Sequence, residues 1–187
     1  KGFIELKEQH LLKPDPNILI RLHPHDVWEP YEPFTNIPEV RIERAGKQRV
    51  KDQLTKGQKV EMDDEDLVNL TETLRYADVV INYVSTMIIE ACIFDKPVIS
   101  VGYPSELAIA NDYEFNKALN STGAVTIAKS PEDLGNAINA YLANPKKDSK
   151  ERHTIVNEHA LFTDGKSWER TATYIYETIE AYRASNP

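Results

Sequence analysis

The stretch ADVVINYVSTMIIEA, residues 77–91, decides the fold of this chain. Its first half is a short apolar run, which predicts a strand over Asp78–Val84. Its second half predicts a helix over Ser85–Phe94, since serine and threonine are favoured where a helix begins. The following apolar run predicts another strand over Pro97–Val101. A strand, a helix and a strand in succession predict a βαβ unit, in which the two strands run parallel.

The same alternation extends from this unit in both directions. Apolar runs predict strands over Asn17–Leu22, Val40–Glu43 and Gly123–Ala128, whereas the prolines of residues 23–38 predict a loop without regular structure. Helices are expected over residues 3–12, 65–75, 131–143, 148–159 and 165–183. We therefore predict one α/β domain over residues 1–187, with a Rossmann-like parallel sheet flanked by helices. Ligands of such sheets bind beyond the carboxyl ends of the strands.

The last expected helix carries an apolar stripe that predicts a docking face. Its members follow helical spacing and are Trp168, Ala172, Ile175, Ile179 and Tyr182.

Composition excludes several classes of protein. The 187 residues include 30 acidic and 22 basic ones, for a net charge of −8, whereas a general nucleic-acid binder needs a basic surface. Apolar runs such as Val79–Ile81 are far shorter than the ~20 residues of a membrane span, so none is predicted. The single cysteine, Cys92, cannot form an internal disulfide or a Cys-rich zinc site, which predicts a reducing cytoplasm.

The start of the chain and its glycines set further expectations. The first residue is Lys1, and no signal-peptide pattern follows it, which predicts a fragment or a processed product of a longer protein. The seven glycines never approach the G-x-G-x-x-G spacing, so no glycine-rich phosphate loop is predicted.

The junction at Ser85 and Thr86 is the first candidate site. Two hydroxyls and the amides of a helix N-terminus together favour an anion such as phosphate. Glu90, further along the same helix, is placed to accept a hydrogen bond from a sugar hydroxyl. The alternative interpretation is that Ser85 only caps the helix and Glu90 is an exposed acid.

Two histidines follow the strand at Asn17–Leu22. His23 and His25 alternate across Pro24, but no third ligand accompanies them, so no metal site is predicted. A histidine here is suited to bind phosphate or to act as an acid, because its pKa lies near neutral pH. Alternatively, it satisfies a carbonyl at the end of the strand.

Several of these motifs together resemble GT-B fold proteins. Ser85-Thr86, Glu90 and the segment Asp95–Ile99 resemble the nucleotide-binding segment of CDP-glycerol glycerophosphotransferases and polysaccharide-biosynthesis enzymes. In those families a Ser-Ser or Ser-Thr pair leads a helix with an acid four or five residues on, followed by a Lys-Pro-Val-Ile strand. Arg21–Pro24 is similar to their (Lys/Arg)-x-His-Pro strand end. Asp164-Gly165-Lys166 is similar to their C-terminal segment, so the resemblance spans residues 17–183.

The resemblance implies roles for particular residues. Ser85 and Thr86 would bind the nucleotide diphosphate, and Glu90 would contact the ribose or the donor sugar. His23 and Arg21 would be catalytic, because they would stabilise negative charge on the departing diphosphate. His25, which follows the same strand as His23, and Ser105, which follows the predicted strand over Pro97–Val101, are further candidate contacts to the donor.

The resemblance also implies a setting for this domain. The chain would be the C-terminal, donor-binding half of a GT-B transferase in surface-polysaccharide or polymer synthesis, without its first strand and its N-terminal acceptor domain. A UDP- or CDP-linked donor would be its substrate, with no cofactor and no metal. We also allow for peripheral association of the full-length protein with a membrane, and activity of this chain alone stays open.

Two other functions remain open at this point. Non-hydrolysing UDP-N-acetylglucosamine 2-epimerases look similar in the same region and would need carboxylates for acid–base work at the sugar. The third reading is a non-catalytic α/β module that binds a nucleotide or a protein partner.

Overall fold

The strands of the chain are parallel, as the sequence predicts. The computed structural model describes residues 2–23, 26–44, 46, 63–83, 85–104 and 112–186. Strands β1 (Ile18–Leu22) and β2 (Val40–Arg44) form one sheet, and β3 (Val80–Asn82), β4 (Val98–Val101) and β5 (Val125–Ala128) form another in the order β3-β4-β5. This arrangement confirms the α/β, Rossmann-like class. It corrects the expectation of one sheet, since β1 and β3 are not paired.

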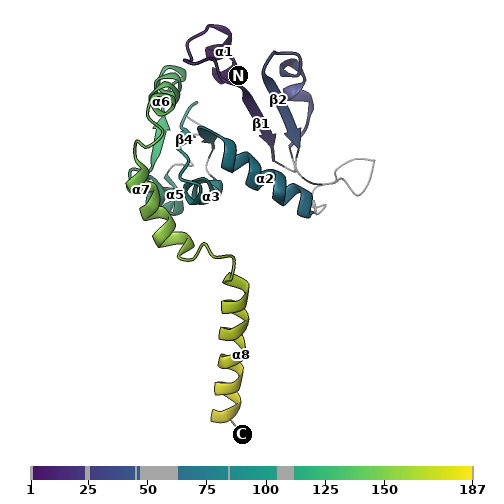
Figure 1. The fold of residues 1–187 in the computed structure, drawn as a ribbon, viewed down its shortest axis with the longest axis vertical. Coiled ribbons are helices and arrows are strands. Elements are labelled where there is room, and N and C mark those ends of the chain that lie inside the picture. The colour runs from purple at the N-terminus through teal and green to yellow at the C-terminus, as the bar shows by residue number, and fades with distance from the viewer. Residues whose placement is uncertain are drawn as a thin grey trace.

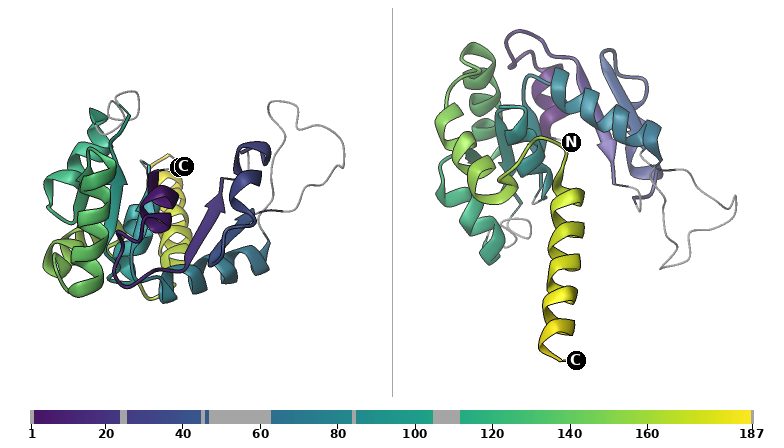
Figure 2. Two further views of the ribbon diagram at one scale, coloured as in Figure 1. Left: turned by 90° about the horizontal axis from the view of Figure 1, so that it is seen from above. Right: turned by 60° about the horizontal axis from the view of Figure 1, so that its bottom comes forward.

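Helices surround the three-stranded sheet on both faces (Figures 1 and 2). One face is covered by α3, α5 and α7, the other by α1 and α6. The bounds of the helices are Gly2–Glu8 (α1), Asp64–Tyr76 (α2), Met87–Ile93 (α3), Glu114–Ser121 (α5), Pro131–Ala143 (α6), Ser149–Ile155 (α7) and Ser167–Ser185 (α8). A single π-helical turn, η3 (Val156–Ala160), extends α7. The α8 helix projects away from the rest of the chain in Figure 1.

Local sequence signals explain where two of these helices begin. Ser130 accepts a hydrogen bond from the Asp133 amide at 3.0 Å and thereby caps α6, which then starts at Pro131. Asp63 and Asp66 form a reciprocal capping box at the start of α2. Acidic residues in the first turn of α2 also lie at the positive end of its dipole.

Three segments differ from the sequence-based expectation, and the first is α5 (Glu114–Ser121), where no helix is predicted. The predicted helix over residues 3–12 ends at Glu8, and His10 adopts a positive φ of 53° two residues later. The proline-rich loop contains a 3-10 helix, η1 (Glu29–Phe34), instead of wholly irregular chain. Proline near its start fits this helix, because the fixed φ of proline is compatible with a helical first turn.

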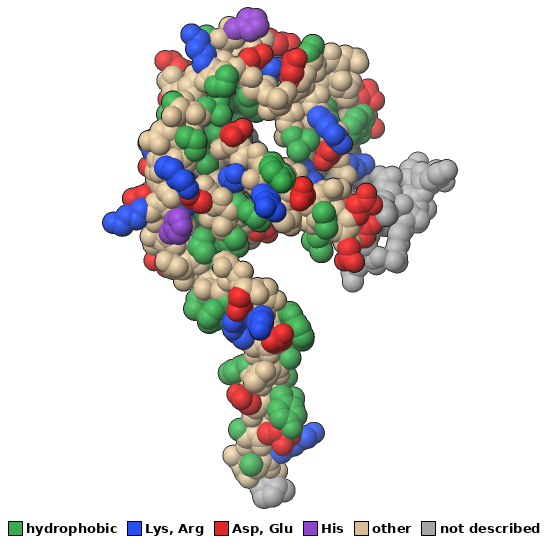
Figure 3. Space-filling model, viewed as in Figure 1, with side chains coloured by type: hydrophobic (Ala, Val, Ile, Leu, Met, Phe, Trp, Pro, Cys, Tyr) green, Lys and Arg blue, Asp and Glu red, His purple; other side chains and the backbone are tan. Residues whose placement is uncertain are grey.

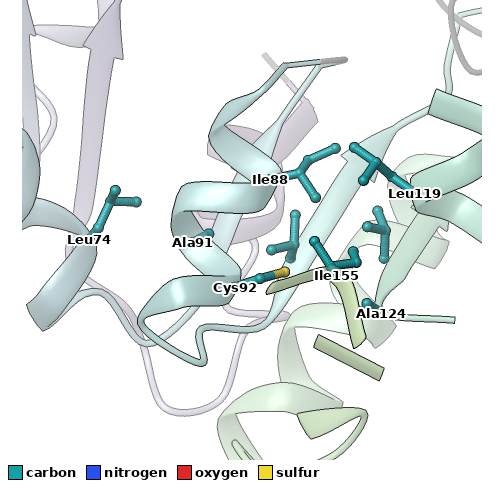
Figure 4. Close-up of a cluster of buried hydrophobic side chains, with 9 residues drawn as sticks. Leu74, Ile88, Ala91, Cys92, Leu119, Ala124 and Ile155 are labelled. Carbon is teal, nitrogen blue, oxygen red and sulfur yellow. The ribbon is translucent and has the colours of Figure 1, made fainter. Parts of the chain in front are cut away.

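The α3 face of the sheet holds a cluster of nine buried side chains (Figure 4). Ile88 and Cys92 point from α3 toward Leu119 of α5 and Ile155 of α7, and each of the four is at most 2% exposed. Burial raises the pKa of the Cys92 thiol to about 12, so this sulfur is an inert part of the core. Leu74 of α2 lies on the other side of α3.

An ion pair below this core joins α3 to α7. The fully buried Arg152 donates from Nε to the Asp95 carboxylate at 2.8 Å and also donates to the carbonyl oxygens of Lys147 and Pro145. Lys146 and Ser149 donate to the other oxygen of Asp95. Burial opposes ionisation of Asp95, but these hydrogen bonds prevail and lower its pKa to about 2.

Removing one partner of this pair leaves a buried charge without its counter-ion. We expect Asp95→Asn to lower the free energy of unfolding by about 3 kcal/mol, because the Arg152 guanidinium then lacks its carboxylate. Urea denaturation followed by circular dichroism measures the change. Asp164→Asn is the matched control, since Asp164 also pairs with an arginine, Arg170, but at the surface, and it should change stability far less.

The Asp95 carboxylate also makes the free energy of unfolding depend on pH in the acidic range. A pKa lowered in the folded state stabilises the protein above the unfolded value of about 4, and the stabilisation is lost as the pH falls toward the folded pKa of about 2. The difference in unfolding free energy between wild type and Asp95→Asn should therefore shrink between about pH 4 and pH 2. Denaturation curves collected across this range test it, and a constant difference contradicts it.

Candidate functional site

Ser85 and Thr86 lie between β3 and α3, as the sequence predicts. The Ser85 hydroxyl oxygen accepts a hydrogen bond from the Met87 amide at 3.2 Å, and its carbonyl accepts one from the Ile88 amide at 3.1 Å. Thr86 is exposed, and its side chain makes no capping hydrogen bond. Ser85 is therefore a local cap, while its O–H and the Thr86 hydroxyl retain the capacity to donate to a ligand.

Glu90 lies one turn beyond Thr86 on the same side of α3, because residues four apart are neighbours on a helix. Its side chain is partly buried, and no hydrogen bond ties it to another described residue. The hydroxyl pair and this carboxylate thus form one polar strip along the start of α3.

Arg21 is held by its own sheet and by α2. Its guanidinium donates to the Asp66 carbonyl at 3.2 Å and lies 3.8 Å from the Glu43 carboxylate. Only 15% of its side chain is exposed, within an open hollow of about 430 Å³ between the two-stranded sheet and α2. Arg41 and Arg44 line this hollow too, but Ser85, Thr86 and Glu90 do not.

His23 ends the two-stranded sheet in a tight turn. Its amide donates to the Asp26 carboxylate at 3.2 Å, and its carbonyl accepts from the Asp26 amide at 2.9 Å. The ring is exposed. His25 and Ser105, the two other predicted donor contacts, lie outside the described residues. The described lining of the hollow at Arg21 thus includes the candidate from β1 and none of those from α3.

A larger hollow, of about 580 Å³, opens beside the carboxyl ends of β4 and β5. Gly102 follows β4 and Lys129 follows β5, and α5 contributes Lys117, Asn120 and Ser121. Among the described lining residues, two lysines stand against one acid, Asp112, and this gives a positive balance. This edge is where parallel sheets hold ligands, so the hollow is suited to an anionic group.

Sequence reasoning missed the residues of this hollow. The predicted strand over Gly123–Ala128 also ends at this edge of the sheet. Lys129 could therefore have been predicted from the rule that ligands bind beyond the carboxyl ends of parallel strands. Lys117 was not, because its position depends on how α5 packs against β5.

Buried amide and hydroxyl groups lie beneath this edge of the sheet. Asn82 and Ser100 are neighbours in the β3–β4 register, and Ser100 is 1% exposed. Asn116 and Asn120 lie four residues apart on α5, and Asn116 is 3% exposed. Both polar atoms of the Asn82 amide are buried without a hydrogen-bond partner among the described residues. An amide in that state costs about 1–3 kcal/mol.

Comparison with known proteins adds no relative. No family model, no curated protein and no solved structure matches the chain. In the described part of the chain, no three histidine, cysteine or acidic side chains gather as metal ligands. None of its helices is both long enough and apolar enough to cross a membrane.

The buried amide of Asn82 leads to a stability prediction. Asn82→Leu should raise the free energy of unfolding by about 1 kcal/mol, because it replaces an unpaired buried amide by an apolar group of similar size. Thermal and urea denaturation measure the change. Asn136→Leu on the exposed side of α6 is the control and should stay within about 0.5 kcal/mol of wild type. A destabilised Asn82→Leu variant would show that the amide is hydrogen-bonded in solution.

Proposed function

We propose that this chain is the donor-binding domain of a GT-B type glycosyl- or glycerophosphotransferase that takes a nucleotide-diphosphate donor. The observation that carries the proposal is the polar strip of Ser85, Thr86 and Glu90 directly after a parallel strand. Parallel α/β sheets bind nucleotides at this edge. The hollow with Lys117 and Lys129 at the neighbouring strand ends supports an anionic ligand.

The proposed roles follow from what each side chain can donate or accept. Ser85 and Thr86 donate hydroxyl hydrogen bonds to the diphosphate, and Glu90 accepts from a ribose or sugar hydroxyl. Donors fixed before the reaction stabilise the charge that develops on the departing diphosphate, which is the main requirement of such a transfer. His23, exposed at the end of β1, and Arg21 are the proposed groups for that charge.

A binding module without turnover is the second candidate. It is favoured by the contacts of Arg21, whose guanidinium already faces Glu43 and the Asp66 carbonyl. Incubation of the full-length protein with labelled UDP- or CDP-linked donor and an acceptor separates the two. Transfer of label supports the transferase. Binding of the donor with neither transfer nor epimerisation supports the module.

Loss of the hydroxyl pair should weaken nucleotide binding. We expect Ser85→Ala/Thr86→Ala to raise the Kd for UDP or CDP about 5- to 150-fold, since hydrogen bonds worth about 1–3 kcal/mol are lost. Isothermal titration calorimetry measures both ligands.

Ser130→Ala is the matched control for this experiment. Ser130 caps α6 just as Ser85 caps α3, so its loss should lower stability but leave nucleotide affinity unchanged. If wild type binds neither nucleotide at millimolar concentration, the donor-binding function is wrong. If the double variant binds as tightly as wild type, Ser85 and Thr86 do not contact the nucleotide.

A further inference from the structure

The α8 helix exposes an apolar seam that no described part of the chain covers. None of the residues Ser167–Ser185 is buried, and Trp168, Ile175 and Tyr182 are 70%, 52% and 69% exposed. Figures 1 and 3 show the helix leaving the body, with apolar side chains along it. The predicted docking stripe is therefore present, and none of the residues that the structure describes covers it.

The composition of α8 means that the helix needs a partner to persist. β-branched and aromatic residues recur along it, and both kinds form helices less readily than alanine or leucine. Most helical stability in proteins comes from packing of an apolar face and little from propensity. The α8 helix without a packing partner is therefore only weakly stable in water.

The spacing of the seam indicates what kind of partner fits. Trp168, Ala172, Ile175, Ile179 and Tyr182 follow one another at intervals of four, three, four and three residues. This is the 3.5-residue repeat of a coiled coil, in which two helices interlock along a narrow line of a and d positions. In that repeat, Ala172 and Ile179 take a positions and the other three take d positions.

We propose that α8 pairs in antiparallel fashion with α8 of a second copy of this chain. An antiparallel pair places each a position beside a d position of the other helix. Ala172 then lies against Tyr182 of the second copy, and Ile175 lies against Ile179, with each contact made twice by the two-fold symmetry. A small side chain facing a large one fills the seam without a void.

The charges beside the seam agree with this direction. Glu169 and Arg183 flank it at e positions, which meet e positions of the second helix when the two run antiparallel. Each end of the pair would thus hold a Glu169–Arg183 contact between copies. Within one copy Arg183 lies 3.1 Å from Glu180, and this exposed pair can be exchanged at little cost.

A parallel pair suits the same residues less well. It would set Ala172 against Ala172 of the second copy, which leaves a gap between bulkier layers. It would also place Arg183 beside Thr178, with no opposite charge. Packing and charge therefore both favour the antiparallel arrangement.

Sedimentation equilibrium of the full chain tests the pairing. We expect a monomer–dimer equilibrium that Ile175→Asp/Ile179→Asp weakens at least ~30-fold, because charges are placed in an apolar seam. Thr173→Asp/Ala181→Asp adds the same charges on the opposite side of α8 and should leave the equilibrium nearly unchanged. A mass of one chain at every concentration up to about 0.5 mM overturns the proposal.

Cysteine cross-linking tests the direction of the pair. Tyr176 occupies the e position nearest the two-fold axis, so oxidation should link Tyr176→Cys chains in the antiparallel dimer. In a parallel dimer Ala172→Cys would be linked instead, and that outcome overturns the proposed direction. Native Cys92 is buried and does not compete. Glu169→Arg should weaken the dimer, and Glu169→Arg/Arg183→Glu should restore it.

Discussion

The contact between Arg152 and Asp95 fixes the part of the molecule on which the candidate site depends. Asp95 lies in the turn from α3 to β4 with a positive φ of 52°, a conformation that costs energy for any residue with a Cβ. Its carboxylate is held by Arg152, Lys146 and Ser149, all from the segment around the start of α7. This turn therefore joins α3 and β4 to α7. The polar strip from Ser85 to Glu90 lies at the start of α3, so its position depends on the same contact.

Because the Arg152 guanidinium is fully buried, its contact with Asp95 cannot be lost without a large cost in free energy. A buried charge is tolerated only when a counter-charge and hydrogen bonds satisfy it. Arg152 has both, because Asp95 supplies the counter-charge and the carbonyl oxygens of Lys147 and Pro145 each accept a hydrogen bond from one of its terminal nitrogens. The loop between α6 and α7 therefore cannot move without leaving donors unpaired. The β1–β2 sheet contacts α2 through Arg21, and α2 in turn reaches the core of the three-stranded sheet through Leu74.

Short-range signals in the sequence were sufficient for most of the elements, though not for α5, and they did not determine the assembly. The runs at Asn17–Leu22 and Gly123–Ala128 contain the observed β1 and β5, and the cap at Ser130 marks the start of α6. The division into two sheets was not predictable, since pairing of β1 with β3 depends on contacts between distant segments. The polar strip on α3 was predicted because it lies on one continuous segment. The contribution of Lys117 to the hollow at β5 was not, because α5 brings it there only after packing.

The polar strip on α3 and the hollow at the ends of β4 and β5 limit what the net charge of the chain says about its ligands. A value of −8 describes the whole chain, but an anion senses the groups within about 10 Å of it, since salt screens charges beyond that distance. At the ends of β4 and β5 those groups include Lys117 and Lys129, and Asp112 is the one acid among the described residues that line the hollow. Many of the acids lie elsewhere, for example at the start of α2, where they stabilise the helix. An acidic chain can therefore hold a phosphate at one edge of its sheet and still lack the extended basic surface that a nucleic acid requires.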